Sequence, residues 1–265
     1  MSILGSLIGK SQTKPDEASK PAVGLPAPEQ PIFAIGDLHG RIDLFERLLE
    51  QVDKEIGSHR LSNPKLIFVG NIIDHGPASA PLIKRMRQLT QEFPNNVECL
   101  LGNHEQMCLD FLDAPLARFA RWMKEGAAAT FESYQVPLPV GGLTTDSAQN
   151  AADMLRDAMG GDVIAWIRSR PSIVSSGTLH VVHAAADPRR AMTDQSTRVL
   201  TWGHPEFLTV ARNDGQWVSH GHTPFERPSL ADSRISVDTA AWRSGTLSCA
   251  MVLQTGQVEF VQVKA

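Results

Sequence analysis

The spacing of apolar residues along this chain alternates between two patterns, and the alternation recurs at regular intervals. A short apolar run, IFAI at 32–35, ends at Gly36, and apolar residues then recur every three or four positions from 42 to 56. The first pattern is typical of a buried strand and the second of an amphipathic helix. The same succession returns after LIFVG at 66–70 and VECLLG at 97–102. The pattern therefore predicts three consecutive β-α units.

The second half of the chain has strand patterns of its own. Alternating segments at 178–184 and 217–224 contain His183 and His222. Three more strand patterns follow at 235–239, 246–254 and 257–263, and the last two are separated by the turn dipeptide Thr255-Gly256, which is typical of a hairpin. We expect the second half to supply a second sheet.

Two further segments complete the predicted organisation. Helical patterns interrupted by the loop VPLPVGGLTTD favour a helical cap inserted at about 114–170. Residues 1–30 are rich in Pro, Ala, Ser and charge, a composition that buries too little apolar area to offset chain entropy. We predict a disordered leader over residues 1–30 and one domain over 31–265.

Composition narrows the classes of partner and location. The formal net charge is -4 and the sequence pI is near 6.1, so no basic footprint for nucleic acid is expected. No apolar run approaches the roughly 18 residues of a membrane span, which argues against integral membrane association. Three cysteines without C-x-x-C spacing argue against a disulfide framework and fit a cytoplasmic protein.

Polar residues that could act in catalysis or metal binding lie just past each of the first three predicted strands. They are Asp37 and His39 in GDLHG, Asn71 and Asp74 in GNIIDHG, and Asn103 and His104 in GNHEQ. The motifs follow one another at spacings of about 30 residues, which is the length of a strand, a crossover helix and a parallel return strand. Right-handed crossovers place the carboxyl ends of such strands at one sheet edge. We therefore expect the three motifs to converge.

The ordered set GD-x-HG, G-x-x-x-D-x-G, GNHE, a strand-terminal His and GHTP resembles the calcineurin-like metallophosphoesterases, most closely their bacterial serine/threonine protein phosphatase branch. Five motifs in order are far more specific than one of them alone. The resemblance extends from Ile32 to the end of the chain. It implies an α/β (α+β) fold in which two facing mixed β-sheets are flanked by helices in four layers, with a two-metal centre at the edge between the sheets.

The resemblance also implies roles for individual residues. Asp37 and His39 are expected to hold a first metal, Asn103, His183 and His222 a second metal, and Asn71 stands at the bridging position. His104 is expected to be the general acid, and Asp74 to orient its imidazole. Carboxylate, imidazole and amide ligands together suit manganese, iron or zinc. Two such ions activate a water and neutralise the phosphate.

The second motif departs from the family pattern GD-x-x-DRG at two places. Asn71 replaces the bridging carboxylate, and an amide offers one neutral oxygen where a carboxylate offers two charged ones, so the centre is expected to hold one ion or a weakened pair. His75 replaces an arginine, and His204 replaces another in TWGHPEFL. We treat His75 and His204 as substrate-binding candidates. Their affinity for phosphate is expected to rise in mild acid, because free histidine has a pKa of about 6.5 and becomes cationic below it.

Two functions from different classes remain open on this basis. The first is a phosphoesterase with a weakened centre that acts on a phosphoprotein, a small phosphate ester or a dinucleotide polyphosphate. The second is a pseudophosphatase, a binding module that uses the same groove without turnover. We favour the enzyme because His104, Asp74 and most ligand positions keep the family's residue types.

Overall fold

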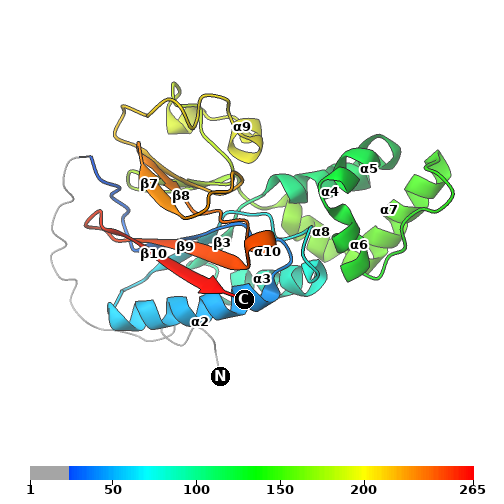
Figure 1. The fold of residues 1–265 in the computed structure, drawn as a ribbon, viewed down its shortest axis with the longest axis horizontal. Helices are drawn as coiled ribbons and strands as arrows, with labels where there is room; N and C mark the ends of the chain where they lie inside the picture. Colours follow the sequence, from blue (N-terminus) through cyan, green and yellow to red (C-terminus); the bar gives the residue numbers. More distant parts are fainter. Residues whose placement is uncertain (1–23) are drawn as a thin grey trace.

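The structure of the protein, a computed structural model, describes residues 24–265, in which two five-stranded sheets face each other (Figure 1). The first sheet has the order β10-β9-β1-β2-β3 and the second the order β4-β5-β6-β8-β7. The strands of the first sheet are β1 (Ile32–Ile35), β2 (Lys65–Phe68), β3 (Val97–Cys99), β9 (Thr246–Val252) and β10 (Val258–Lys264). Those of the second are β4 (Ile173–Ser176), β5 (Leu179–Val182), β6 (Trp217–His220), β7 (Ser229–Ala231) and β8 (Arg234–Ser236).

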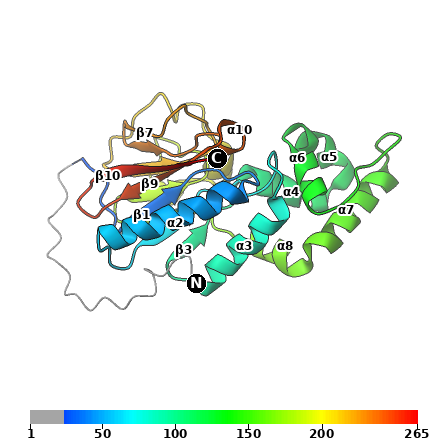
Figure 2. The same cartoon turned by 60° about the horizontal axis from the view of Figure 1, so that its bottom comes forward.

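Helices cover the outer faces of both sheets and extend beyond one end of them. They are α2 (Ile42–Ser58), α3 (Ser79–Glu92), α4 (Asn103–Asp113), α5 (Pro115–Lys124), α6 (Ala127–Ser133), α7 (Thr145–Met159), α8 (Gly161–Arg168), α9 (Thr197–Trp202) and α10 (Ala241–Ser244). Figure 2 shows α2 and α3 lying across the first sheet. Helices α5 to α8 form the green group at the far end in Figure 1, and α9 lies over the second sheet.

The alternation along β1 explains the layered core. Phe33 and Ile35 belong to the apolar cluster shared with α2 and α3, whereas Ile32 and Ala34 belong to the cluster between the two sheets. Successive side chains of a strand point to opposite faces, so a strand that is apolar at every position needs cover on both sides. The predicted fold class, two facing mixed sheets flanked by helices, is confirmed.

Strand pairing confirms the predicted β-α units and corrects one assignment. β1 pairs with β2, and β2 with β3, in parallel. The predicted hairpin forms from β9 and β10, but β9 pairs antiparallel with β1 in the first sheet, so its assignment to a second sheet was wrong. Most of β9 is buried on both faces, a position that only the middle of a covered sheet provides.

The predicted disordered leader is wrong for its last residues. Ala27 pairs with Thr178, whose backbone N–H donates to the Ala27 carbonyl oxygen and whose hydroxyl accepts from the Ala27 N–H at 2.8 Å. The Glu29 N–H donates to Ser176 Oγ in the second sheet, while the Glu29 carbonyl accepts from Gln254, just past β9 of the first. Residues 1–23 lie outside the described residues. Within 24–265 no helix has the length and apolar character to span a bilayer.

Candidate metal centre

The loops that follow β1 and β2 are joined backbone to backbone at the edge of the first sheet. The N–H groups of Leu38 and His39 both donate to the Asn71 carbonyl, at 3.0 and 2.8 Å, and the Gly40 N–H donates to the Ile72 carbonyl at 2.7 Å. These bonds fix the first two polar motifs against each other. The convergence predicted from parallel crossovers is therefore what the structure shows for these two motifs.

Five residues of this edge have a left-handed backbone, which non-glycine residues adopt rarely. They are His39, Asn71, Asp74, His75 and His222, with φ between 42° and 72°. Such conformations cost on the order of 1 kcal/mol or more each and persist where surrounding contacts enforce them. Their concentration here marks the edge as a functional site.

Asn103, His183 and His222 form a compact set of donors. The Asn103 side-chain oxygen lies 2.8 Å from His183 Nε2 and 3.1 Å from His222 Nδ1. His183 Nδ1 contacts the Val69 carbonyl oxygen at 2.8 Å, which fixes the tautomer and leaves the Nε2 lone pair directed at Asn103. All three predicted ligands of the second metal are brought together, and their atoms fit the mixed amide and imidazole coordination of a divalent transition metal.

Asp37, His39 and Asn71 are also brought together, but they are arranged differently. Asp37 Oδ2 lies 3.9 Å from His39 Nε2, and the Asn71 side-chain amide donates a hydrogen bond to the same Asp37 oxygen at 2.9 Å. The Asn71 oxygen accepts from the backbone N–H of His104 at 3.2 Å. Exchanging the amide oxygen and nitrogen gives two unfavourable contacts, so this orientation is determined by its partners. Asn71 presents a donor to Asp37 and no shared oxygen, so this set does not fit a bridged ion.

The carboxylate of Asp37 is buried and tightly enclosed. Its Oδ1 accepts from the His222 N–H at 3.2 Å, and a Cβ on Gly221 would lie 2.1 Å from that oxygen, which explains why the GHTP motif needs glycine there. Burial raises the pKa of Asp37, and the nearby Asp238 raises it further. Burial likewise raises the pKa of Asp238 to about 6. A cation beside these carboxyl groups would favour their charged forms.

Asp238 is a site residue that the sequence analysis did not select. It follows β8, is 5% exposed, and accepts a hydrogen bond from the Ala240 N–H at 2.7 Å. Asp238 lies two residues past β8, as Asp37 lies two residues past β1, but the strand predicted over 235–239 enclosed it and hid that signal. We expect it to modulate the charge at Asp37.

His104 and Asp74 form the predicted pair, with Nδ1 and Oδ2 2.7 Å apart. Asp74 is fully buried and also accepts from Trp122 Nε1 at 2.7 Å and from the Thr130 hydroxyl at 2.5 Å. Trp122 and Thr130 lie on α5 and α6 of the helical segment, and the local sequence does not distinguish Trp122 from an ordinary apolar helix position. The helical segment therefore supplies two hydrogen-bond donors to the site.

Burial acts on both members of this pair. It raises the pKa of Asp74 to about 7, against the opposing hydrogen bonds of Thr130 and Trp122. Burial, with a smaller contribution from the neighbouring His75, lowers the pKa of His104 to about 3. His104 is therefore a neutral imidazole whose Nδ1 faces Asp74 and whose Nε2 carries a lone pair, until a negative charge arrives beside it.

Glu105 holds the second motif in place. Its two carboxylate oxygens accept from the backbone N–H groups of Asn71, Ile72, Ile73 and Gly102, at 2.7 to 3.2 Å. The sequence indicated only a carboxylate in the first turn of a helix. Because Glu105 binds the backbone at the bridging position and at the two residues after it, it is a positioning residue for Asn71.

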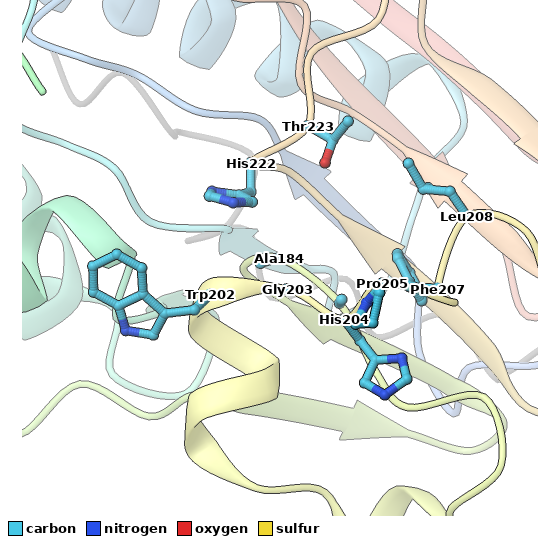
Figure 3. Close-up of a pocket in the computed structure, with 10 residues that line it drawn as sticks. Ala184, Trp202, Gly203, His204, Pro205, Phe207, Leu208, His222 and Thr223 are labelled. Carbon is cyan, nitrogen blue, oxygen red and sulfur yellow. The ribbon is translucent and has the colours of Figure 1, made fainter.

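The two histidines predicted to bind substrate lie in different surroundings. His75 lies beside His39 and His104, with ring centroids 4.9 and 5.3 Å away, and stacks on Trp242 at 4.3 Å. His204 lines a separate cavity of about 350 Å³, and its Nε2 is 3.7 Å from an Asp187 oxygen. Figure 3 shows the His204 ring turned away from His222. The two are not brought together as one phosphate clamp.

The same cavity lies directly beside the compact donor set. His222 and Thr223 line one side, and Trp202, Phe207 and Leu208 give it apolar walls (Figure 3). Leu101, just before the GNHE motif, is buried in the core and does not line the cavity. The cavity thus offers aromatic and apolar contacts next to possible metal ligands.

Comparison with known proteins identifies the family to which this chain belongs. The sequence profile of the calcineurin-like phosphoesterases matches residues 30–226, which is most of the chain. The chain belongs to the calcineurin-like phosphoesterase family. The resemblance inferred from the five motifs is therefore confirmed, and with it membership of a hydrolase family that uses divalent metals.

Several characterised proteins are similar to this chain. It is 25% identical over 227 residues to the asymmetrical bis(5'-nucleosyl)-tetraphosphatase PrpE of Oceanobacillus iheyensis, covering 78% of this chain and 83% of that one. It is 24% identical over 157 residues to the symmetrical bis(5'-nucleosyl)-tetraphosphatase of Methylococcus capsulatus, covering 59% and 44%.

Solved structures support the fold. A structure assigned to a diadenosine tetraphosphatase has a TM-score of 0.59 at 18% identity and covers 90% of this chain and 96% of its own. A serine/threonine phosphatase of Saccharomyces cerevisiae has a TM-score of 0.54 at 14% identity, with 93% and 84% covered. At these identities the likeness shows a shared calcineurin-like phosphoesterase fold.

Proposed function

We propose that this chain is a metal-dependent phosphoesterase whose principal ion is held by Asn103, His183 and His222. The observation that carries the proposal is the convergence of two ring nitrogens, His183 Nε2 and His222 Nδ1, on the Asn103 oxygen, at 2.8 and 3.1 Å. Bringing these polar groups together inside the protein is unfavourable unless they share a partner. A bound divalent ion supplies Lewis-acid stabilisation of the charge on a phosphoryl oxygen.

His104 serves as the proton donor to the leaving oxygen in this proposal. Its Nδ1 is held by Asp74, so the ring is oriented with Nε2 free for substrate. Trp122 and Thr130 fix the Asp74 carboxylate in turn. A phosphate beside His104 favours the imidazolium through its negative charge, so the ring becomes an acid when substrate is bound.

The first ion position is weakened by Asn71. Its amide N–H already satisfies the Asp37 oxygen that a metal needs, and its own oxygen is taken by the His104 N–H. An ion entering between Asp37 and His39 must displace that hydrogen bond without gaining a bridging carboxylate. We infer one tightly held ion of manganese, iron or zinc, and at most weak occupation of the bridged position.

The substrate we favour is a nucleoside polyphosphate rather than a phosphoprotein. The cavity beside His222 has Trp202 and Phe207 in its lining, and aromatic walls suit a nucleobase. The tetraphosphatase relatives hydrolyse dinucleotide tetraphosphates according to their names, and they align with most of this chain. A small aryl phosphate fits the same chemistry and serves as a probe.

A pseudophosphatase remains the second candidate, and one observation favours it. The hydrogen bonds of Asn71 satisfy Asp37 without any metal, so that half of the site is stable without turnover. A module of this kind binds phosphate groups in the groove and leaves them intact.

The deciding experiment measures metal content and hydrolysis together. Elemental analysis gives Mn, Fe and Zn per chain, and the substrates are an aryl phosphate and diadenosine tetraphosphate, each with added Mn²⁺. We expect one ion per wild-type chain, and loss of ion and hydrolysis in His183→Ala. His180→Ala is the matched control, because His180 lies on β5, which His183 directly follows, and bonds to Ser175 and Gln216. A wild-type chain that binds phosphate but neither metal nor turnover supports the pseudophosphatase.

A further inference from the structure

Three imidazoles meet at the edge of the first sheet, and only two of them stand at positions to which the family motifs give a role in metal binding or proton transfer. His39, His75 and His104 each offer a ring nitrogen, and these atoms lie within 4.8 Å of one another. The ring centroids are 4.6 to 5.3 Å apart. His39 and His104 are buried and His75 is half-buried, so the cluster is shielded yet reachable.

Two of the three rings are already oriented as metal ligands usually are. His39 Nδ1 contacts the Ile73 carbonyl oxygen at 2.8 Å, and His104 Nδ1 contacts the Asp74 carboxylate at 2.7 Å. Metal-binding histidines commonly donate their second nitrogen to a carbonyl or carboxylate in this way, which fixes the tautomer and ring direction. In both residues Nε2 is left as the ligand atom.

The third ring, His75, is held by Trp242 on its face and Gly126 at its edge. His75 stacks on Trp242 with an interplanar angle of 11° and a centroid distance of 4.3 Å. Gly126 lies against its Nδ1 edge, where an added Cβ would be 2.5 Å away, so Nε2 is the nitrogen turned away from the backbone. A histidine in this position adds a neutral donor that an arginine cannot supply.

We propose that His39, His75 and His104 form an all-imidazole site for Zn²⁺ or a similar transition-metal ion, distinct from the Asn103 set. Three imidazoles with an open fourth position are a known zinc arrangement, and Zn–N bonds of about 2.0–2.1 Å place tetrahedral donors roughly 3.3 Å apart. The nitrogens must approach by about 1.5 Å, a movement of side chains rather than of strands. Imidazole suits zinc, copper and nickel better than magnesium or calcium.

The two substitutions in GNIIDHG act together in this site. Asn71 occupies the Asp37 oxygen through its amide N–H, which disfavours an ion between Asp37 and His39. His75 offers that ion a nitrogen on the other side of His39. Together, the substitutions at 71 and 75 disfavour an ion that shares His39 with the Asp37 carboxylate. They favour an ion that shares His39 with the His75 imidazole.

Occupation of this site has a regulatory consequence, which rests on the proposed function while the site itself does not. His104 Nε2 cannot bind a metal and donate a proton at once. Zinc on the three histidines therefore removes the general acid and inhibits hydrolysis, while the ion of the Asn103 set stays in place. The site is an inhibitory zinc site.

The site is tested by zinc titration calorimetry on the full chain, with Co²⁺ absorption as a second reading. Variants His75→Phe, which keeps the stack on Trp242, and His75→Arg remove the third nitrogen. His204→Gln is the control, because His204 lines the neighbouring cavity away from the cluster. We expect the His75 variants to lose one zinc equivalent, or at least about 100-fold in its affinity, and to lose the visible band of tetrahedral cobalt. His204→Gln retains both.

The outcomes separate this proposal from the proposed function. Thermal unfolding first establishes that at least one His75 variant is folded. Zinc stoichiometry and affinity equal to wild type in a folded His75 variant overturn the site. An inactive wild type that still loses one zinc equivalent on His75→Phe refutes the enzyme and leaves the site standing. In an active wild type, zinc beyond the first equivalent is expected to lower turnover at least tenfold, and unchanged turnover overturns its inhibitory role.

Discussion

The two predicted metal-ligand sets lie at one edge of the protein, but they differ in how their atoms face each other. In the set of Asn103, His183 and His222, an acceptor oxygen and two ring nitrogens converge, so the three lack enough hydrogens to satisfy one another fully. In the set of Asp37, His39 and Asn71, the amide N–H meets the carboxylate directly. With the Asn103 oxygen turned toward both rings, the first set leaves the His183 Nε2 lone pair facing an acceptor, a conflict that a cation relieves, whereas the second set is largely satisfied without one.

The difference comes from a single atom of a side chain. Asparagine and aspartate have nearly the same shape, but one presents an NH₂ group where the other presents a charged oxygen. At a bridging position that exchange turns a shared ligand into a hydrogen-bond donor. Sequence similarity to a metal motif therefore does not establish a metal site until the direction of each polar group is known.

Breaking the compact set has the largest expected effect. Asn103→Ala removes the oxygen that joins His183 and His222, so we expect loss of the bound ion and a fall in turnover of about 10³-fold, which corresponds to about 4 kcal/mol. Elemental analysis and aryl phosphate hydrolysis measure both. Asn96→Ala is the control, since Asn96 bonds to Asn63 and Pro64 away from the site. Full activity in Asn103→Ala is incompatible with the proposed ligand set.

Repairing the other set has the next largest effect. Asn71→Asp replaces the donor with a carboxylate that can bridge two ions, so we expect metal content to rise from about one to two ions per chain. Turnover is expected to rise about 10- to 100-fold, since a bridging carboxylate offsets the repulsion between the cations. Steady-state kinetics with added Mn²⁺ give the change. Unaltered metal content in the variant contradicts the role given to Asn71.

A smaller effect is expected where the helical segment supports the acid pair. Trp122→Phe removes the Nε1–H that donates to Asp74, leaving His104 less firmly oriented, and we expect turnover to fall about tenfold with a smaller change in KM. Trp166→Phe is matched, because Trp166 donates to Thr90 on the same group of helices and away from Asp74. Equal losses in both variants indicate a general packing effect and remove the positioning role of Trp122.

The smallest expected effect is on the free energy of unfolding, and it comes from the contact between Gly126 and His75. Gly126→Ala places a Cβ about 2.5 Å from His75 Nδ1 and also strains a residue with φ of +88°. Gly245→Ala is the matched control, because Gly245 has φ +69° and ψ 15° against +88° and 15° at Gly126, and its added Cβ meets only an ordinary contact at 3.4 Å. We expect urea unfolding to show a loss for Gly126→Ala that is about 1 kcal/mol greater, from the contact alone. Matching losses exclude a close fit between Gly126 and His75.

Sequence patterns predicted the layers of this fold better than its connections. The strands at Ile32–Ile35, Lys65–Phe68 and Val97–Cys99 followed from apolar runs of the right length. The partner of β9 did not, because an apolar strand fits the middle of either sheet and only the long-range pairing with β1 decides. The order of Ala27 and Glu29 also depends on hydrogen bonds to distant strands, which composition does not record.

The sequence predicted which residues form the site, but not which of their atoms donate and which accept hydrogen bonds. Motif order brought out Asn103, His183 and His222, whose side chains do meet. It could not show that the Asn71 amide turns its nitrogen to Asp37, because that depends on the His104 N–H lying on the other side. Local sequence likewise carries no signal that a buried tryptophan on a separate helix reaches the catalytic pair.

The hydrogen bonds from Trp122 and Thr130 to Asp74 also limit how this protein can be re-engineered. Because α5 and α6 each contribute a donor to the acid pair, the helical segment is not an exchangeable cassette. A chimaera that borrows the corresponding segment from a relative must carry over both donors at the same depth. Directed evolution of a new substrate range is therefore better begun in the loops around α9, which border the cavity without touching Asp74.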